Sequence, residues 1–233
     1  TDSDFPSGSG LGSSAAVTVA LLAALSSAEG RLREDVVAKE AFEVECEVQG
    51  RASPIDTSTC AHGGGILVKK EGSDGLLWEI VKDTRRWCVH DIKVPAMTLV
   101  VGFTGKAAPT GPLVAKVKRY VDRSTFARDI IDEIGDITLD GAAQLAKGDL
   151  EGLGRTMTKD HKLLAILGVS SPELDKLVAS VLPHSYGAKL TGAGGGGSMV
   201  ALTDQPQKVM EVIRRKGGQP FVGVTGVPGV RIE

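Results

Sequence analysis

A glycine- and serine-rich loop near the start of the chain runs directly into a helix of small residues, which restricts what the chain can fold into. The loop reads GSGLGSS from Gly8 to Ser14, and the run AAVTVALLAAL follows it. Glycines at positions 8, 10 and 12 leave room for backbone N–H groups to close around an anion. Free amides and the positive end of the helix dipole face the same point. The pattern predicts a phosphate-binding loop, with a serine hydroxyl available to Mg²⁺.

A flexible turn capped by serine is the alternative for such a loop taken alone. Two other phosphate-binding patterns do not fit. No lysine follows the glycines as in G-x-x-x-x-G-K-[ST]. The loop also lacks the G-x-G-x-x-G order of a dinucleotide-binding turn.

Composition limits the class of protein. The chain has 233 residues, 30 glycines, 4% aromatic residues and a net charge of −2, which favours a loop-rich α/β protein without nucleic-acid or anionic-membrane partners. Three cysteines without CxxC spacing indicate reduced thiols rather than disulfides or a zinc site. No uninterrupted apolar segment approaches membrane-spanning length. The sequence therefore predicts a cytoplasmic protein.

Hydrophobic periodicity predicts the elements. Helices are expected over residues 14–28, 32–49, 112–121, 125–147, 150–167, 172–182 and 207–216. Residues 64–70 and 75–81 are expected to form paired strands with EGSDG as their turn, and further strands are expected over 96–105, 185–190, 199–202 and 220–224. A domain boundary near Val94 is expected, because hairpin sequence gives way to helices there.

A second glycine run, GAGGGGS from Gly192 to Ser198, lies between two of the expected strands. Such a run lets another backbone or a ligand approach closely, and a flexible hairpin loop is the alternative. Thr191 and Ser198 supply hydroxyl groups at its two ends.

Two carboxylates lie between the glycine motifs. Glu45 falls on the helix expected over 32–49, and Asp56 follows the rigid Ser-Pro pair in the next loop. A kinase needs one carboxylate to share a metal with phosphates and another to orient the acceptor hydroxyl. A helix-surface charge and an N-cap residue are the alternative interpretation.

The motifs resemble those of the GHMP kinases. PSGSGLGSSAA looks like that family's phosphate-binding motif, and KLTGAGGGGSMVAL looks like its C-terminal glycine motif. The resemblance implies an α/β (α+β) two-domain fold, with an incomplete ribosomal S5-like domain over residues 1–93 and a ferredoxin-like domain over residues 94–233. It implies ATP as the phosphoryl donor, bound by Pro6, Gly8, Ser9, Gly10, Leu11, Gly12, Ser13, Ser14, Ala15, Gly192, Ala193, Gly194 and Gly195.

The segment VECEVQGRASPID is similar to mevalonate kinases, especially archaeal-type members. By that match Ser14 and Glu45 would ligate Mg²⁺, and Asp56 would act on the C5 hydroxyl of mevalonate. The implied reaction yields 5-phosphomevalonate for isoprenoid biosynthesis. Two further similar segments would place Thr110 near the acceptor and let His161 reach substrate, although His161 could equally be a helix-surface histidine.

Departures from the family pattern leave alternatives open. Cys60-Ala61-His62-Gly63-Gly64 stands where Ser-Thr-x-Gly-Gly is usual, and Ala108-Pro109-Thr110-Gly111 keeps only the threonine of Arg-Ser-Thr-Lys. Another GHMP kinase, acting on phosphomevalonate or a homoserine-like alcohol, is the first alternative. Diphosphomevalonate decarboxylases share the fold, but the Glu45 helix and the run LLAILGVS favour a kinase.

Complete family members carry a lysine-containing segment before the phosphate loop, whereas only a few residues precede it here. We therefore expect a fragment with an open sheet edge and exposed core. A catalytically inactive nucleotide-binding fragment is the second alternative, and assembly as a homodimer is left open.

Overall fold

The structure is a computed structural model that describes residues 9–50, 52–107 and 110–231. These residues form two compact units, and each combines two stretches of the chain. The C-terminal unit comprises residues 9–11 and 95–224, and the N-terminal unit comprises residues 12–94 and 225–231. The predicted domains, residues 1–93 and 94–233, are each one continuous stretch of the chain, whereas each compact unit combines two stretches. The predicted domain boundary stays a proposal.

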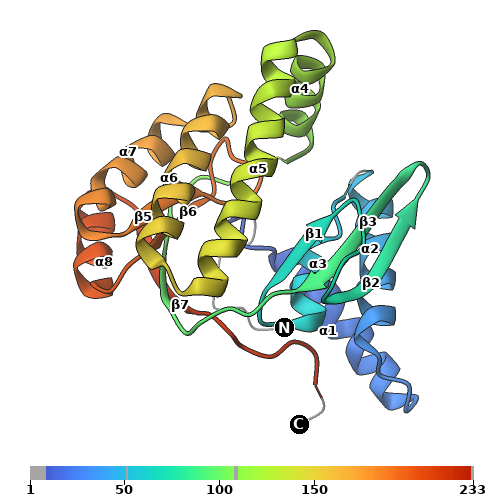
Figure 1. The fold of residues 1–233 in the computed structure, drawn as a ribbon. Helices are drawn as coiled ribbons and strands as arrows, with labels where there is room; N and C mark the ends of the chain where they lie inside the picture. The colour runs from blue at the N-terminus through green and yellow to red at the C-terminus, as the bar shows by residue number, and fades with distance from the viewer. Residues whose placement is uncertain (1–8, 51, 108–109, 232–233) are drawn as a thin grey trace. The chain divides into compact units, whose positions relative to one another are not determined.

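The N-terminal unit consists of three helices and a three-stranded antiparallel sheet (Figure 1). Its helices α1 (Ser13–Ala28), α2 (Glu34–Gln49) and α3 (Ile55–His62) pack against one another pairwise. Helix α2 begins with Glu34 and Asp35, whose charges oppose the positive helix end, and stops at Gly50 with a left-handed φ of 72°. Its sheet has the order β1-β3-β2, formed by β1 (Ile66–Lys69), β2 (Leu76–Lys82) and β3 (Arg85–Asp91).

The core of this unit lies along one face of α2. Phe42 is fully buried there and meets the ring of Trp87 edge-on at 5.5 Å between centroids. The buried side chains come from all three helices and from β2 and β3: Val19, Val37, Ala38, Ala41, Phe42, Cys46, Ala61, Trp78, Ile80 and Val89.

The predicted pairing of residues 64–70 with 75–81 is wrong, because β3 lies between those two strands. Ile66 pairs with Asp91, and Trp78 pairs with Val89. Strand β3 escaped prediction because its sequence RRWCVHD opens with two arginines and includes a histidine. The β2–β3 hairpin turns at Asp83, whose φ of 55° is a conformation that Asp tolerates in tight turns.

Helix α1 is apolar around its whole circumference, which is typical of a helix with neighbours on all sides. In the structure it buries Ala15 and Val19 but leaves Val17, Leu21 and Leu25 exposed. A cavity of about 890 Å³ lies between α1, the end of α3 and residues 227–231, all within the N-terminal unit. The described residues thus leave part of the α1 surface uncovered.

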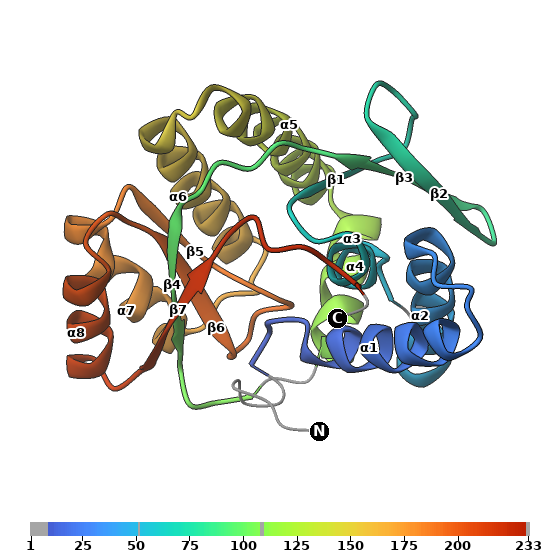
Figure 2. The ribbon, with the colours of Figure 1, turned by 90° about the horizontal axis from the view of Figure 1, so that it is seen from below.

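The C-terminal unit contains an antiparallel sheet of order β5-β6-β4-β7. Its strands are β4 (Thr98–Phe103), β5 (Gly187–Leu190), β6 (Ser198–Leu202) and β7 (Gln219–Val224). Helices α7 (Pro172–Val181) and α8 (Pro206–Arg215) cover one face (Figure 2). The β-α-β-β-α-β sequence with this strand order matches the predicted ferredoxin-like arrangement. The α/β (α+β) class is confirmed, and the S5-like assignment stays a prediction.

Three further helices and a short 3-10 turn lie between β4 and β5. They are α4 (Thr110–Arg123), α5 (Thr125–Lys147), α6 (Leu150–Ile166) and η1 (Leu182–His184). Short polar side chains cap α5, α6 and α7 at their starts: Ser124, Asp149 and Ser171 accept hydrogen bonds from the N–H groups of Ala127, Gly152 and Leu174. Among the described residues, none of the helices combines the length and apolar character needed to cross a bilayer.

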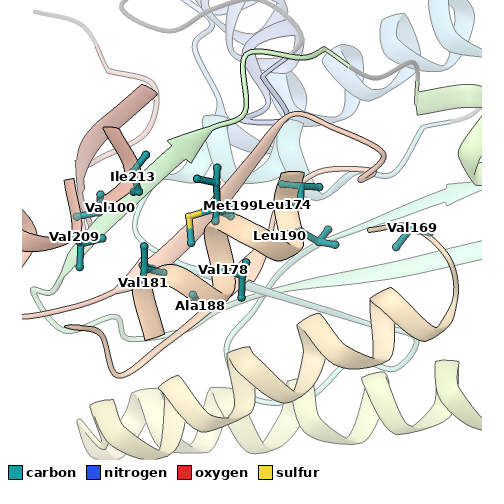
Figure 3. Close-up of a cluster of buried hydrophobic side chains, with 12 residues drawn as sticks. Val100, Val169, Leu174, Val178, Val181, Ala188, Leu190, Met199, Val209 and Ile213 are labelled. Atoms are coloured by element: carbon teal, nitrogen blue, oxygen red, sulfur yellow. The ribbon is translucent and has the colours of Figure 1, made fainter. Parts of the chain in front are cut away.

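The core of the C-terminal unit lies between the sheet and its two covering helices (Figure 3). Val100 of β4 and Met199 of β6 are fully buried and belong to one cluster with Ile213 of α8. Leu174 and Val178 add the apolar face of α7 to the same cluster. This packing holds Met199 and Ala201 of β6, and the second glycine run ends at Ser198, the first residue of that strand.

Helix α6 closes the free edge of β5. A Cβ atom on Gly187 would lie 1.8 Å from the Gly154 carbonyl oxygen, so the two backbones touch only because both residues are glycine. The Ala188 N–H donates to Thr158 Oγ1 at 3.3 Å, and the Leu190 N–H donates to His161 Nδ1 at 3.2 Å. Side chains of α6 therefore satisfy edge donors that would otherwise be open to another strand.

We expect Gly187→Ala to lower the free energy of unfolding by about 1–3 kcal/mol, because overpacking forces the α6 and β5 backbones apart. Urea unfolding would measure the change. Gly135→Ala in α5 is the matched control: among the described residues, no atom outside the local helix backbone lies within 4 Å of its added Cβ, and the substitution should stabilise the helix by about 0.5–1 kcal/mol. Equal stability of Gly187→Ala and the wild type would contradict the contact.

Candidate functional site

The described part of the first loop rests on the second glycine run within the C-terminal unit. Ser198 Oγ donates to the Ser9 carbonyl at 2.7 Å, and Thr191 Oγ1 donates to the Gly10 carbonyl at 3.3 Å. A Cβ atom on Gly192 would lie 2.9 Å from Gly10 Cα. The two glycine motifs, far apart in sequence, therefore meet backbone to backbone.

The second glycine run is held by backbone contacts on its other sides as well. The Gly195 N–H donates to the Val169 carbonyl at 2.7 Å, and a Cβ on Gly194 would lie 2.0 Å from the same oxygen. The Gly197 N–H donates to the Lys106 carbonyl at 2.7 Å. Positive φ angles at positions 192, 194, 195 and 197 add a conformational reason for glycine. These contacts disfavour the flexible-hairpin alternative.

In the N-terminal unit, Gly12 is the N-cap residue of α1, with a left-handed φ of 70°. A glycine cap brings no side chain to the first-turn N–H groups, and no acidic residue lies in that turn. The positive end of α1 is therefore available to an anion. Asp56 Cγ lies 3.4 Å from the point where a Gly12 Cβ would be, so this carboxylate is the immediate neighbour of the loop.

Asp56 lies in the first turn of α3 and not in the predicted loop. Pro54 precedes the helix as its N-cap residue, and Asp56 is its second residue. The side chain is exposed at the surface of the unit, but the surrounding protein removes enough water to raise the pKa of its carboxyl. The shift makes Asp56 a stronger base than an ordinary aspartate.

Cys60 and Glu45 complete the acidic surroundings of Asp56. Cys60 lies one helical turn after Asp56, on the same side of α3. Burial, followed by the negative charges of Asp56 and Glu45, raises the pKa of the Cys60 thiol from 9.0 to about 11. Glu45 of α2 is only 6% exposed. At neutral pH the thiol remains protonated and adds no third negative charge.

Comparisons with known proteins match the two parts of the chain that carry the glycine motifs to one family. The GHMP kinases N terminal domain model matches residues 1–64, and the GHMP kinases C terminal model matches residues 142–219. Mevalonate kinases from Pyrococcus furiosus and Thermococcus sibiricus are 37% and 39% identical to the chain, over 99% of the chain and 67% of each relative. The chain belongs to the GHMP kinase family.

A solved structure extends the likeness to the fold. The mevalonate kinase of L. major in complex with R-mevalonate superposes with a TM-score of 0.79 at 26% identity, covering 94% of the chain and 67% of that structure. The chain thus spans about two thirds of the length of these GHMP kinases.

Residues predicted to bind nucleotide in this GHMP kinase divide between the units. Ser9, Gly10 and Leu11 belong to the C-terminal unit with Gly192, Ala193, Gly194 and Gly195, whereas Gly12, Ser13, Ser14 and Ala15 belong to the N-terminal unit. Pro6 and Gly8 lie outside the described residues. Ser14 is exposed in the first turn of α1, and Ala15 is buried. The Oγ of Ser9 is buried without a hydrogen-bond partner among the described residues.

The two predicted acceptor contacts lie in the C-terminal unit. Thr110 is the first residue of α4. His161 of α6 is 7% exposed, and its Nδ1 accepts the Leu190 N–H while its Nε2 lies 3.3 Å from Asp175 Oδ1. Burial lowers the pKa of His161, against the opposing effect of Asp175. Both ring nitrogens thus have protein partners, and contact with substrate stays a prediction.

Sequence reasoning missed two contributors to the site of this GHMP kinase. One is helix α3, although Pro54 followed by Asp56 in a first turn is a recognised helix-start signal. The other is the segment after β7, which binds the end of α3: the Val230 N–H donates to the Ala61 carbonyl at 3.0 Å. Nothing in its local sequence indicated where it would bind.

His62, the last residue of α3, joins three elements of the N-terminal unit. Its Nδ1 lies 3.0 Å from Glu34 Oε2 at the start of α2, and its Nε2 lies 3.2 Å from Asp91 Oδ1 at the end of β3. Burial alone would lower the pKa of His62, but hydrogen bonds and charge interactions with Glu34 and Asp91 outweigh it and raise the pKa. The charged form of His62 therefore stabilises the folded state.

We expect the His62 contribution to be fully present below its ordinary pKa of 6.5 and to disappear as pH rises through the raised folded pKa. Urea unfolding of the wild type and His62→Gln at pH 6 and pH 8 should show a larger difference at about pH 6. Solvent screening at this half-buried site limits the pH-dependent part to less than about 1 kcal/mol.

His184→Gln is the matched control, since no ion pair among the described residues includes His184. It should give the same difference from the wild type at both pH values. A His62→Gln difference that grows from pH 6 to pH 8 would contradict the assigned sign.

Proposed function

We propose that the chain carries the phosphoryl-transfer centre of a mevalonate kinase. The γ-phosphoryl group of ATP moves to the C5 hydroxyl of mevalonate, giving 5-phosphomevalonate for isoprenoid biosynthesis. The observation that carries the proposal is the Asp56 carboxylate beside Gly12, at the positive end of α1. The choice of acceptor rests on relatives named mevalonate kinase, which align with 99% of the chain.

Phosphate binding follows from the backbone of the first loop. The first-turn N–H groups of α1 and the helix dipole bind the ATP phosphates, and glycine at positions 10 and 12 keeps side chains out of their way. The second glycine run supports this loop through Gly192 and Ser198. The proposed ATP-binding residues are those predicted from the two motifs: Pro6, the residues from Gly8 to Ala15, and the residues from Gly192 to Gly195.

The donor set suits Mg²⁺. Ser14 offers a hydroxyl and Glu45 a carboxylate, which are the hard oxygen ligands that Mg²⁺ prefers. Mg²⁺ in kinases commonly takes one or two protein carboxylates together with phosphate oxygens and water. The described residues contain no cluster of three acidic, histidine or cysteine ligands, and such a site requires none. Ser14 and Glu45 would hold the metal, which would offset charge on the phosphates.

Asp56 orients the acceptor. Its carboxylate accepts a hydrogen bond from the C5 hydroxyl and holds it in line with the γ-phosphorus. It takes the proton as the new P–O bond forms and the bond from the γ-phosphorus to the leaving ADP breaks. Its raised pKa favours this transfer. Because the phosphoryl group moves through a loose transition state, positioning supplies most of the rate. The protonated Cys60 thiol avoids adding repulsion near the phosphates.

Asp56→Asn should lower kcat by about 10²–10⁴-fold with little change in the KM for ATP, because the amide cannot accept the proton. Coupled detection of ADP would measure both constants. Asp74→Asn, in the segment before β2, is the matched control and should behave like the wild type. Wild-type turnover by Asp56→Asn would rule out the assigned base.

A panel of acceptors tests the substrate. ADP release should be fastest with mevalonate and slow with phosphomevalonate or homoserine. Faster turnover of either alternative would reassign the chain to another kind of GHMP kinase, and released CO₂ would indicate a decarboxylase. ATP binding without turnover of any acceptor would favour a catalytically inactive nucleotide-binding protein.

The proposal extends to location and assembly. We place the enzyme in the cytoplasm, since ATP and mevalonate are both water-soluble metabolites. A homodimer is the assembly to be tested: light scattering would then give twice the chain mass of 24.2 kDa.

A further inference from the structure

After β7 the chain enters the N-terminal unit, where residues 225–231, here called the tail segment, bind the end of α3 (Figure 2). The Gly229 N–H donates to the His62 carbonyl at 3.1 Å, and the Val230 N–H donates to the Ala61 carbonyl at 3.0 Å. These carbonyls belong to the last turn of α3, where no intrahelical donor is available. The tail segment therefore acts as the C-terminal cap of α3.

The contact has no room for side chains. A Cβ atom on Gly229 would lie 2.1 Å from the Ala61 carbonyl oxygen, and one on Gly63 would lie 2.2 Å from the Gly229 nitrogen. Gly229 is not among the residues with positive φ, so only the close approach requires glycine there. The next side chain, Val230, packs against the core cluster that contains Ala61 and Val19.

Helix α3 joins this contact to the acidic site. It has eight residues, and helices of this length are marginal without external contacts, so its position depends on what binds its ends. Asp56 lies in the first turn beside Gly12, and His62 lies in the last turn under the tail segment. Because α3 is one short helix, a displacement of its last turn also displaces the Asp56 carboxylate in its first turn.

We propose that the tail segment is a positioning element for phosphoryl transfer: by binding the last carbonyls of α3 it holds the Asp56 carboxylate beside the phosphate loop. Gly229 is the positioning residue through which the tail segment acts, and its contacts are with Ala61 and His62 of α3. The inference rests on the proposed function of Asp56. An error of about 1 Å at a reacting group can cost on the order of 10²-fold in rate, so a modest shift of α3 is sufficient.

The test compares Gly229→Ala with Gly223→Ala. Among the described residues, a Cβ on Gly223 in β7 meets the Leu99 carbonyl oxygen at 3.8 Å and no other non-neighbouring atom within 4 Å, which is an ordinary contact. Gly229→Ala should lower kcat by about tenfold or more while the KM values for ATP and mevalonate stay within about threefold. Gly223→Ala should leave all three constants unchanged.

Three free cysteines give a second readout that does not depend on activity. Cys60 lies on α3, whereas Cys46 and Cys88 are buried in α2 and β3. Labelling with N-ethylmaleimide, followed by mass spectrometry, should show Cys60 of Gly229→Ala reacting about tenfold faster than in the wild type, with Cys46 and Cys88 unchanged. General unfolding would instead expose all three thiols together.

Each outcome decides a separate point. Wild-type labelling of Cys60 in Gly229→Ala, or fast labelling with an unchanged kcat, would overturn the positioning role. A wild-type chain without turnover would overturn the proposed function, and Cys60 labelling would still test the contact between the tail segment and α3.

If Gly229→Ala unfolds, Pro228→Gly loosens the same segment without a clash. Selective labelling of Cys60 in that variant then supports the inference, and unchanged labelling refutes it.

Discussion

Direct packing of backbone on backbone, at points where no side chain fits, is the constraint on which this structure depends. It recurs between Gly10 and Gly192, between Gly194 and Val169, between Gly154 and Gly187, and between Gly63 and Gly229. Each contact lies within one unit and joins segments that are distant in sequence. The second glycine run, the edge of β5 and the end of α3 are all held in this way.

Electrostatics sets the second condition on the site. A phosphate loop needs positive potential, yet the carboxylates of Asp56 on α3 and Glu45 on α2 both lie close enough to Cys60 to raise the pKa of its thiol. The positive end of α1 and the loop N–H groups offset this negative charge. The thiol of Cys60 stays neutral because its pKa is raised, so it adds no third negative charge. Under the proposed function, Glu45 would help to hold Mg²⁺, which would offset part of this negative charge.

Local sequence predicted the candidate residues whose signals are local, and their functional roles stay proposals. Both glycine runs and Asp56 could be predicted, because small residues before a helix and a carboxylate after Ser-Pro carry their meaning in a few positions. Strand β3 was missed because its polar residues hide the alternation, and β1 and β2 were consequently paired wrongly. The tail segment was missed for a different reason: its partners are the carbonyls of Ala61 and His62, and backbone groups leave no trace in a sequence.

The junction of α6 and β5 has a consequence for how this chain can change over time. When a large residue is lost from a core, a neighbour can grow to fill the space, and when one is gained, a neighbour can shrink. At this junction both partners, Gly154 and Gly187, are already the smallest residue available. Neither residue can be made smaller to make room for a larger one at the other position. We therefore expect glycine to be retained at both positions.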